Sequence, residues 1–208
     1  MNVLDRLAFS LERRDEVPNQ ELAAEILRSA DIEAVNELVS NLSNKNKGIR
    51  YDCIKVLYEI GYAEPEMIAD HVPVFLDLLT SKDNRLQWGA MTAIGSVVKV
   101  KPAEVFESLS KIVGAADKGS VITRDHCVNI LISLSGIEMY ADTAFPLLLE
   151  QMIRCPENQL PMYAERSVST ITTATKKSFI KVLTSRMISL EKDSGRRRLQ
   201  KVVARLSR

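Results

Sequence analysis

The stretch SKDNRLQWGAMTAIG, residues 81–95, decides the fold because its residue pattern returns every 37 residues. Steps of 37 from Ala90 reach Cys53, Cys127 and Ala164, which are all small. The positions four before, four after and seven after form columns in which only Thr123 is polar. Positions spaced in this way share one face of an α-helix, so the repeat predicts a helix with a small residue in its buried face. The columns are Ile49, Leu86, Thr123 and Leu160; Leu57, Ile94, Leu131 and Val168; and Ile60, Val97, Leu134 and Ile171.

Each of these helices is preceded by a residue that is suited to begin it. Asn46, Asp83 and Ser120 lie 37 residues apart, and their side-chain oxygens can accept hydrogen bonds from the free N–H groups of a first helical turn. In the fourth copy Glu157 takes this column, and Asn158 beside it is the expected cap. The sequence therefore predicts four equivalent helices.

A second helix follows in each copy. Pro65 and Pro102 are again 37 residues apart, where proline suits a first helical turn, whereas Pro146 interrupts the third copy and shifts it by about one residue. A helix pair leaves one face uncovered, so the pairs must stack, and we predict an all-α, right-handed α-solenoid of antiparallel helix pairs. The predicted helices are 2–14, 19–29 and 31–42, then the pairs 47–61 with 65–80, 84–99 with 102–116, 121–135 with 138–153 and 158–173 with 176–190, and finally 195–206.

We expect the 208 residues to form a single domain. Aromatic residues make up only 5 % and the chain has 8 Gly and 7 Pro, a composition that favours helices over a β-sandwich or barrel. The parts of this domain would be N-terminal capping helices with a partial repeat at 1–45, four helix-pair repeats at 46–190 and a basic C-terminal capping helix at 191–208.

The stretch VPVFLDLLTSKDNRLQWGAMTAIGSV, residues 72–97, resembles the HEAT repeat of the armadillo-type α-helical repeat proteins. Pro73, Asp83, Leu86 and Ala90 match the pattern of that family, and Gln87 stands where the family has arginine. The resemblance covers about residues 30–190 and implies the fold. It says little about function, because HEAT-like repeats occur in trafficking, chromosome, phosphatase and DNA-repair proteins alike.

The resemblance also implies a ladder in which an acid of one repeat pairs with an arginine of its neighbour. Arg50 and Arg124 supply that arginine in the copies on either side of Gln87. Asn46 and Ser120 replace the acid, so the ladder is expected to be incomplete.

The residue types that carry catalysis are scarce in this chain. It has no Gly-rich phosphate loop, no nucleophile-elbow motif and no metal-binding histidine pair. His126 and Cys127 are neighbours on a helix and point about 100° apart, so Cys127 is expected in the core, like Cys53, with His126 at or near the surface. Cys155 precedes Pro156 in a predicted loop, where it could be exposed. We therefore predict no enzymatic activity, no cofactor and no bound metal.

Cysteine usage and hydropathy bear on the compartment. Three irregularly spaced cysteines do not make a disulfide framework, and no apolar run approaches the roughly 20 residues that span a bilayer. The expectation is a reduced, cytoplasmic protein without membrane contact.

Trp88, the only tryptophan, lies opposite the buried face of its helix. Counting about 100° per residue, the columns on that side contain Tyr51 and Trp88 and, seven residues on, Tyr58 and Ile132. These residues either fold against neighbouring repeats, form an apolar strip on the convex face that binds another protein, or meet a second copy. The candidate partner-binding residues are Tyr51, Tyr58, Trp88 and Ile132.

Charge is distributed unevenly along the chain. Residues 176–208 contain 11 Lys or Arg and 2 acidic residues, a formal +9, whereas residues 1–175 contain 17 and 25, a formal −8. The basic end is either the solvated face of a capping helix or a surface for an acidic protein, a nucleic acid or, least of all, a membrane. The candidate anion or nucleic-acid contacts are Lys177, Lys181, Arg197, Arg198, Lys201 and Arg205.

By the resemblance, the second helices line the concave side of the solenoid. The column Asp70, Glu107, Ala144 and Lys181 runs from acidic to basic there, and the column of Leu148 is mixed. Such a surface suits an extended peptide or a protein better than a duplex of uniform charge. We therefore predict a non-enzymatic protein-binding scaffold or adaptor. The alternative is a nucleic-acid-binding protein and, at the extreme, a glycosylase like the HEAT-like DNA alkylation-repair enzymes, whose DNA-binding groove uses several tryptophans.

Overall fold

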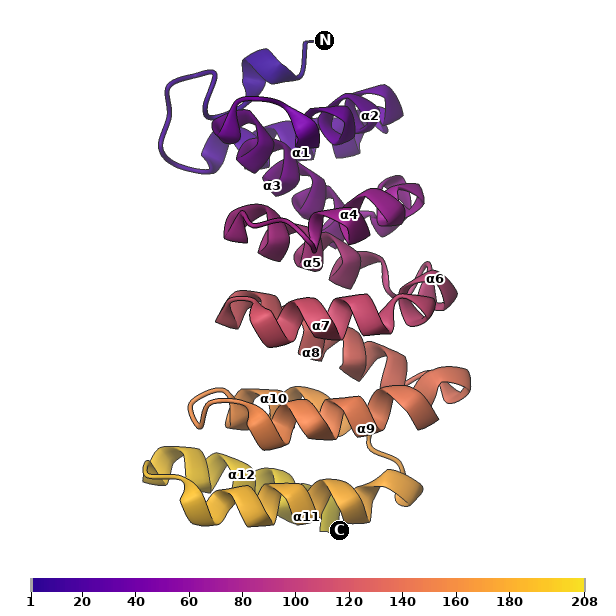
Figure 1. The fold of residues 1–208 in the computed structure, drawn as a ribbon, viewed down its shortest axis with the longest axis vertical. Coiled ribbons are helices and arrows are strands. Elements are labelled where there is room, and N and C mark those ends of the chain that lie inside the picture. Colours follow the sequence, from indigo (N-terminus) through magenta and orange to yellow (C-terminus); the bar gives the residue numbers. More distant parts are fainter. Residues whose placement is uncertain (1, 208) are drawn as a thin grey trace. The chain divides into compact units, whose positions relative to one another are not determined.

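The computed structural model describes residues 2–207, and every regular element within them is a helix. Contacts between residues divide the chain into two compact units, residues 1–127 and 128–208, and the division falls inside the helix Val121–Ser135. Each unit is built from helices that lie in successive antiparallel pairs (Figure 1). No helix in the described part of the chain is both long and apolar enough to cross a membrane.

Unit 1 begins with a short 3-10 turn and an irregular loop before its first α-helix. Its second helices are interrupted, whereas its first helices run unbroken. The elements are η1 (Leu4–Arg6), α1 (Val17–Ser29), α2 (Ile32–Ser40), η2 (Asn41–Ser43), α3 (Lys47–Ala63), η3 (Pro65–Met67), η4 (Ala69–His71), α4 (Val72–Leu78), α5 (Asn84–Val97), α6 (Pro102–Glu107), α7 (Leu109–Lys118) and the first half of α8 (Val121–Ser135).

Unit 2 contains the longer second helices. α9 includes Pro146 in its interior and is not broken by it. The elements after the remainder of α8 are α9 (Glu138–Arg154), α10 (Leu160–Ser167), η5 (Val168–Thr170), α11 (Thr173–Ser189) and α12 (Asp193–Ser207).

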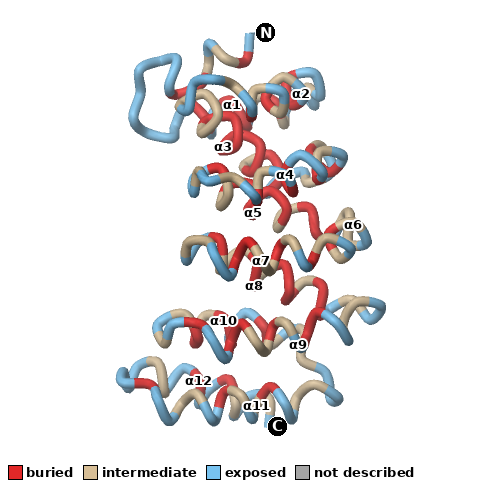
Figure 2. Tube along the Cα trace, viewed as in Figure 1, coloured by how far each residue is buried: buried red, intermediate tan, exposed pale blue. Residues whose placement is uncertain are grey.

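The 37-residue repeat correctly identifies the buried face of the first helices. Cys53, Ala90, Cys127 and Ala164 are fully buried, and Thr123, the polar exception, is buried as well. Long buried stretches lie on the first helices of the pairs, such as α3 and α5 (Figure 2). Three residues at the ends of the columns are less buried than the rest: Ile49, Val168 and Ile171 are half-buried.

The predicted caps are confirmed in three of the four copies. The side chain of Asn46 accepts from the N–H of Gly48, that of Asp83 from Arg85, and that of Ser120 from Thr123. Asn158 does not cap the fourth helix, which begins at Leu160 after Gln159 and has no side-chain cap.

The helix predicted at residues 2–14 is wrong. The segment makes only the short turn η1 and then a loop, because buried side chains of other elements accept hydrogen bonds from its backbone N–H groups. Asp52 accepts from the N–H of Phe9 at 2.6 Å, and Asn19 accepts from the N–H of Ala8 at 3.0 Å. Asn19 also donates to Asp52 at 2.8 Å, so two buried polar side chains replace the hydrogen bonds of a helix.

Candidate functional site

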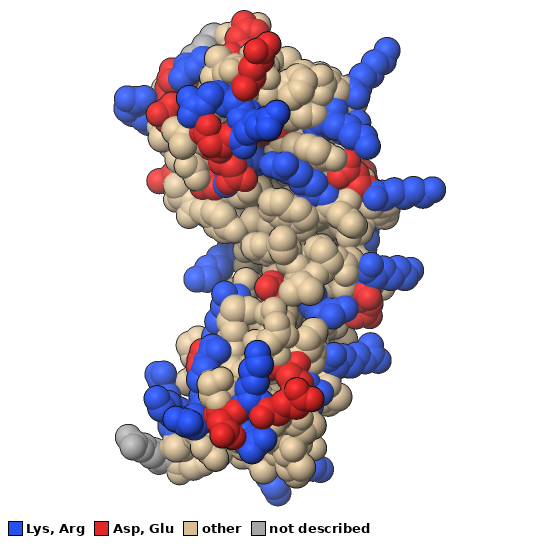
Figure 3. Space-filling view, turned by 90° about the vertical axis from the view of Figure 1, so that its left-hand side faces the viewer, with Lys and Arg blue, Asp and Glu red and all other residues tan. Residues whose placement is uncertain are grey.

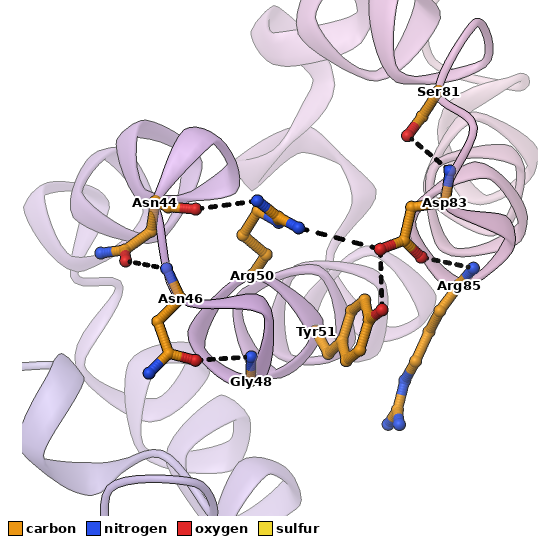
Figure 4. Close-up of polar contacts among 8 residues, drawn as sticks. All are labelled: Asn44, Asn46, Gly48, Arg50, Tyr51, Ser81, Asp83 and Arg85. Carbon is orange, nitrogen blue, oxygen red and sulfur yellow. Dashed lines mark hydrogen bonds and ion pairs between the residues drawn. The ribbon is translucent and has the colours of Figure 1, made fainter.

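One rung of the ladder that the resemblance implied is present in unit 1 (Figure 4). The Nη2 atom of Arg50 lies 3.8 Å from the Oδ2 atom of Asp83, and the hydroxyl of Tyr51 donates to the same oxygen at 2.7 Å. Burial alone would raise the pKa of the Asp83 carboxyl, but hydrogen bonds from Tyr51 and from backbone N–H groups outweigh it and lower that pKa. In the next copy Gln87 donates to the carbonyl of Leu79, so it closes a turn. The rung explains how α3 and α5 are held, and the Nε atom of Arg50 is buried there without a hydrogen-bond partner among the described residues.

The aromatic residues of unit 1 form a cluster around α3. The Tyr58 ring lies 5.9 Å from the rings of both Tyr62 and Trp88, between centroids. Lys55 is 6 % exposed and is held between Glu16 and Glu59, with its ammonium group 4.9 Å from the centroid of the Tyr58 ring. Burial alone would lower the pKa of Lys55, but the two carboxylates outweigh it and raise that pKa.

This burial favours the first of the three alternatives for these residues, packing against neighbouring repeats. Tyr58 is 6 % exposed and Ile132 is 9 % exposed, while Tyr51 and Trp88 are half-buried. The reason is that neighbouring side chains cover this side of the helices, as the first of the alternatives anticipated. A binding role for these four residues stays a prediction, with Tyr51 and Trp88 retaining the most surface.

All three cysteines are buried in the folded chain. Cys53 and Cys127 are fully buried, and burial raises the pKa of each thiol to about 12, so neither is a thiolate near neutral pH. Cys155 is buried too, and its thiol donates to the carbonyl of Met152, which corrects the expected exposure. His126 is half-buried. Residues 2–207 contain no cluster of three or more His, Cys, Asp or Glu side chains placed to hold a metal ion.

Unit 2 has an open groove between its second helices, α9 and α11. At the end where both helices begin, the groove widens into a depression of about 730 Å³ that includes Phe145, Pro146 and Ile171. Serine and threonine hydroxyls line the side toward α11, and the exposed carboxylates of Glu138 and Asp142 line the side toward α9. Neither carboxylate takes part in an ion pair within the described residues.

A separate depression lies between the same two helices, nearer their other end. It measures about 400 Å³ and is lined by apolar side chains, among them Leu149, Ile153 and Val182, and by the cations Lys181 and Arg186. Ile153 is 51 % exposed, although it is a large apolar residue. We call these two depressions together the α9–α11 groove: it is acidic at one end, has apolar side chains in both depressions and is basic at the other end.

Arg186 is fixed at the basic end of the groove. Its Nη2 atom donates to the carbonyl of Cys155 at 2.7 Å, which ties α11 to the end of α9. Its Nε atom is buried and has no hydrogen-bond partner among the described residues. Lys181 is exposed and makes no ion pair there, so it is the freer cation of the two.

The sequence predicts a graded surface on the second helices, but some of the residues predicted to form it are buried instead. In the third copy Ala144 and Leu148 are fully buried, because the register shift near Pro146 turns those columns inward. Glu138 and Asp142 provide the acidic end instead, and the exposed side chain of Ile153 was not predicted. The one-residue shift at Pro146 is visible in the sequence. Moving the columns of the third copy by one residue would have given the correct residues of α9.

The predicted basic residues lie on two helices of unit 2 and do not form one patch. Lys177 and Lys181 are exposed on α11, and Arg197, Lys201 and Arg205 are exposed on α12. Arg198 donates two hydrogen bonds to Glu165, at 2.7 and 2.6 Å, so its charge is already paired. The space-filling view shows acidic side chains among the basic ones in the part that belongs to unit 2 (Figure 3). Their contact with an anion or nucleic acid stays a prediction.

No family model matches the sequence, and no match is found among curated proteins. Solved structures are similar over nearly the whole chain. The designed armadillo repeat protein YIII(Dq)4CqI has a TM-score of 0.62 at 12 % identity, covering 98 % of this chain and 99 % of that one. A designed armadillo repeat protein in complex with the peptide (KR)4 has a TM-score of 0.64 at 13 % identity, with 98 % and 99 % covered. An archaeal HEAT-like repeats protein from Thermococcus onnurineus NA1 has a TM-score of 0.50 at 14 % identity, with 93 % and 97 % covered.

These likenesses show the fold alone, since the identities are low. The chain has an all-α solenoid fold of the HEAT/armadillo-like repeat type, as the repeat and the resemblance predicted.

Proposed function

We propose that this chain is a non-enzymatic repeat scaffold that holds a segment of another protein in the α9–α11 groove. The observation that carries the proposal is the groove itself. It exposes apolar side chains such as Ile153 between two carboxylates at one end and Lys181 at the other, and none of these charges is paired within the described residues. Exposed apolar surface with a charged rim is typical of protein-binding sites.

The dimensions of the groove suit an extended peptide. Asp142 and Ile153 are eleven residues apart on α9, which corresponds to about 16 Å along a helix, and about five residues of extended chain span that length. A peptide with a basic residue beside Glu138 and Asp142, apolar residues in the middle and an acidic residue beside Lys181 would complement the groove. Contacts at both charged ends would fix its direction.

The comparisons support peptide binding in general terms. One similar structure is a designed protein in complex with the peptide (KR)4, which shows that a protein of this fold can hold a peptide. That peptide carries only positive charge, whereas the α9–α11 groove carries both signs. We therefore expect this chain to prefer a peptide of mixed charge. The same mixed charge disfavours a duplex, whose phosphates are uniformly negative.

The test is a selection of short random peptides displayed on phage, followed by fluorescence anisotropy of the selected peptides with the full chain. Ile153→Asp places a charge in the apolar part of the groove and should weaken binding at least about tenfold. Ile188→Asp is the matched control, because Ile188 is 85 % exposed on α11 and does not line the groove.

Two results would contradict the proposal. One is a selection that enriches no peptide. The other is a set of enriched peptides that bind the Ile153→Asp and Ile188→Asp variants equally well, which would place the binding surface elsewhere.

A further inference from the structure

Unit 2 has a second furrow, on its other helix layer, between α10 and α12. One depression of about 330 Å³ lies at the start of these helices and includes Pro161 and Leu190. Another, of about 180 Å³, lies farther along and includes Val168 and Val202. Arg198 lines both depressions, so they meet at its side chain. We call this surface the α10–α12 furrow.

A salt bridge crosses the furrow at its middle. The guanidinium of Arg198 donates two parallel hydrogen bonds to the carboxylate of Glu165, and they lower the pKa of that carboxyl. This pairing neutralises both groups and holds α10 and α12 together. Beyond the bridge, the furrow is lined by Val168, which is half-buried, and by Val202, which is only 5 % exposed, with Lys201 and Arg205 at its rim.

Three cations of α12 make no ion pair within residues 2–207: Lys201 and Arg205, which line the furrow, and Arg197, which lies beside Arg198 of the bridge and lines neither depression. All three are exposed. They are spaced four residues apart on α12, which places them on one stripe with steps of about 6 Å along the helix axis. A row of charges beside an apolar depression matches a partner whose own charges repeat at the same interval.

We propose that the α10–α12 furrow docks an acidic amphipathic helix of a partner protein. Carboxylates spaced four residues apart on that helix repeat at about 6 Å and would meet Arg197, Lys201 and Arg205 in turn. Its apolar side chains would cover the half-buried side chain of Val168 beside this stripe. This surface is separate from the α9–α11 groove, so it adds a second docking site and does not depend on the first.

The furrow fits a protein helix better than a nucleic acid. Lys201 and Arg205 could contact phosphates, but no aromatic side chain lines the furrow for base stacking. The carboxylates of Glu157, Glu165 and Glu191 also line it and would repel a polyanion along its length. A helix with acidic residues at one end only avoids that repulsion.

The experiment uses the full chain and a labelled alanine-based helical peptide with Glu at every fourth position in one half only and Leu on the adjoining face. Fluorescence anisotropy at low and moderate salt measures its binding, beside a twin peptide with Gln for Glu and a duplex DNA. We expect the Glu peptide to bind, and the double variant Lys201→Ala with Arg205→Ala to bind it about tenfold more weakly. Binding should fall with salt, yet only in part, because the apolar contact is not screened.

Matched controls separate this site from the groove. The double variant Lys177→Ala with Lys181→Ala removes two exposed cations from α11 and should leave binding of the Glu peptide unchanged, as should Ile153→Asp. Three results would overturn the inference: equal binding of the Glu and Gln peptides, no loss in the α12 double variant, or binding of the duplex in preference to the Glu peptide, which would make the stripe a nucleic-acid contact.

Discussion

The two units are built from the same 37-residue pattern but differ in how their neighbouring helices are joined. In unit 1, α3 and α5 are joined by the Arg50–Asp83 rung and by a close approach at Gly89. In unit 2, α9 and α11 leave an open groove and α10 and α12 leave a furrow, with one exposed salt bridge across it. Charge differs as well: residues 1–127 carry 15 Lys or Arg and 20 acidic residues, a formal −5, and residues 128–208 carry 13 and 7, a formal +6.

The difference shows that the apolar columns specify the fold, whereas the residues between them specify how closely the helices approach. Unit 1 uses its polar residues internally, as Asp52, Lys55 and Asp83 each bind partners from other elements. Unit 2 leaves several charges unpaired at its surface. A buried polar network raises stability and leaves little to bind a ligand, so we expect unit 1 to be the rigid part and unit 2 the binding part.

The largest effect is expected at the buried carboxylate of unit 1. Asp52→Ala removes the acceptor for the N–H of Phe9 and for the side chain of Asn19, which is 1 % exposed. Leaving buried donors without partners should lower the free energy of unfolding by about 2–4 kcal/mol. Urea unfolding followed by the fluorescence of Trp88, which lies in unit 1, measures the change directly.

The control for this variant is Asp70→Ala. Asp70 also makes an ion pair, with Lys101 at 2.8 Å, but its side chain is 86 % exposed, so its loss should lower stability far less than Asp52→Ala does. If the two variants were equally stable, the polar network under the N-terminal segment would contribute no more than a surface ion pair, and the contrast between the units would weaken.

The next effect concerns the close approach of α3 and α5. A Cβ atom at Gly89 would lie 2.8 Å from the Cγ1 atom of Ile54, which is buried, whereas a Cβ atom at Gly114 meets nothing within 4 Å. Gly89→Ala should therefore destabilise unit 1 by about 1–2 kcal/mol, because overpacking exceeds the gain in helix propensity. Gly114→Ala keeps that gain and should stabilise the helix by about 0.5–1 kcal/mol. Opposite signs in thermal unfolding are the expected result, and a shared sign would mean that the α3–α5 contact adjusts freely.

The sequence was sufficient for the helices whose pattern is local. The helix at 121–135 was predicted with its observed bounds, and the caps Asn46, Asp83 and Ser120 were correct, because periodicity and capping depend on neighbouring residues. The N-terminal segment was mispredicted because its partner, Asp52, is more than forty residues away. Such a contact leaves no periodic trace in the sequence.

The candidate surfaces were predicted only in part, for a related reason. The charge gradient of the second helices was visible in the sequence, but the groove depends on the register at Pro146 and on how α9 and α11 diverge. Likewise, Arg198 looked like a free cation until its partner Glu165 was seen on α10. Exposure and pairing are properties of tertiary structure, and one sequence alone does not specify them.

The smallest effect tests the two charged links between helices against each other through their pH dependence. The pKa of Asp83 and the pKa of Glu165 are both lowered in the folded state, so each link contributes stability above the unfolded pKa of about 4 and loses it as the pH falls through the folded value. The side chain of Asp83 is 17 % exposed and that of Glu165 is 42 % exposed, so water and salt screen the second link more. Asp83→Asn keeps the helix cap, yet it should cost about 1 kcal/mol at neutral pH, and that cost should shrink as the pH falls below about 4. Glu165→Gln should cost at most about 0.5 kcal/mol at neutral pH.

The two variants need different measurements, because they lie in different units. Unfolding followed by Trp88 fluorescence reports on Asp83→Asn, and hydrogen exchange of α10 and α12 reports on Glu165→Gln. A larger pH-dependent loss for Glu165→Gln would reverse the assignment, because the exposed bridge of unit 2 would then be the stronger link.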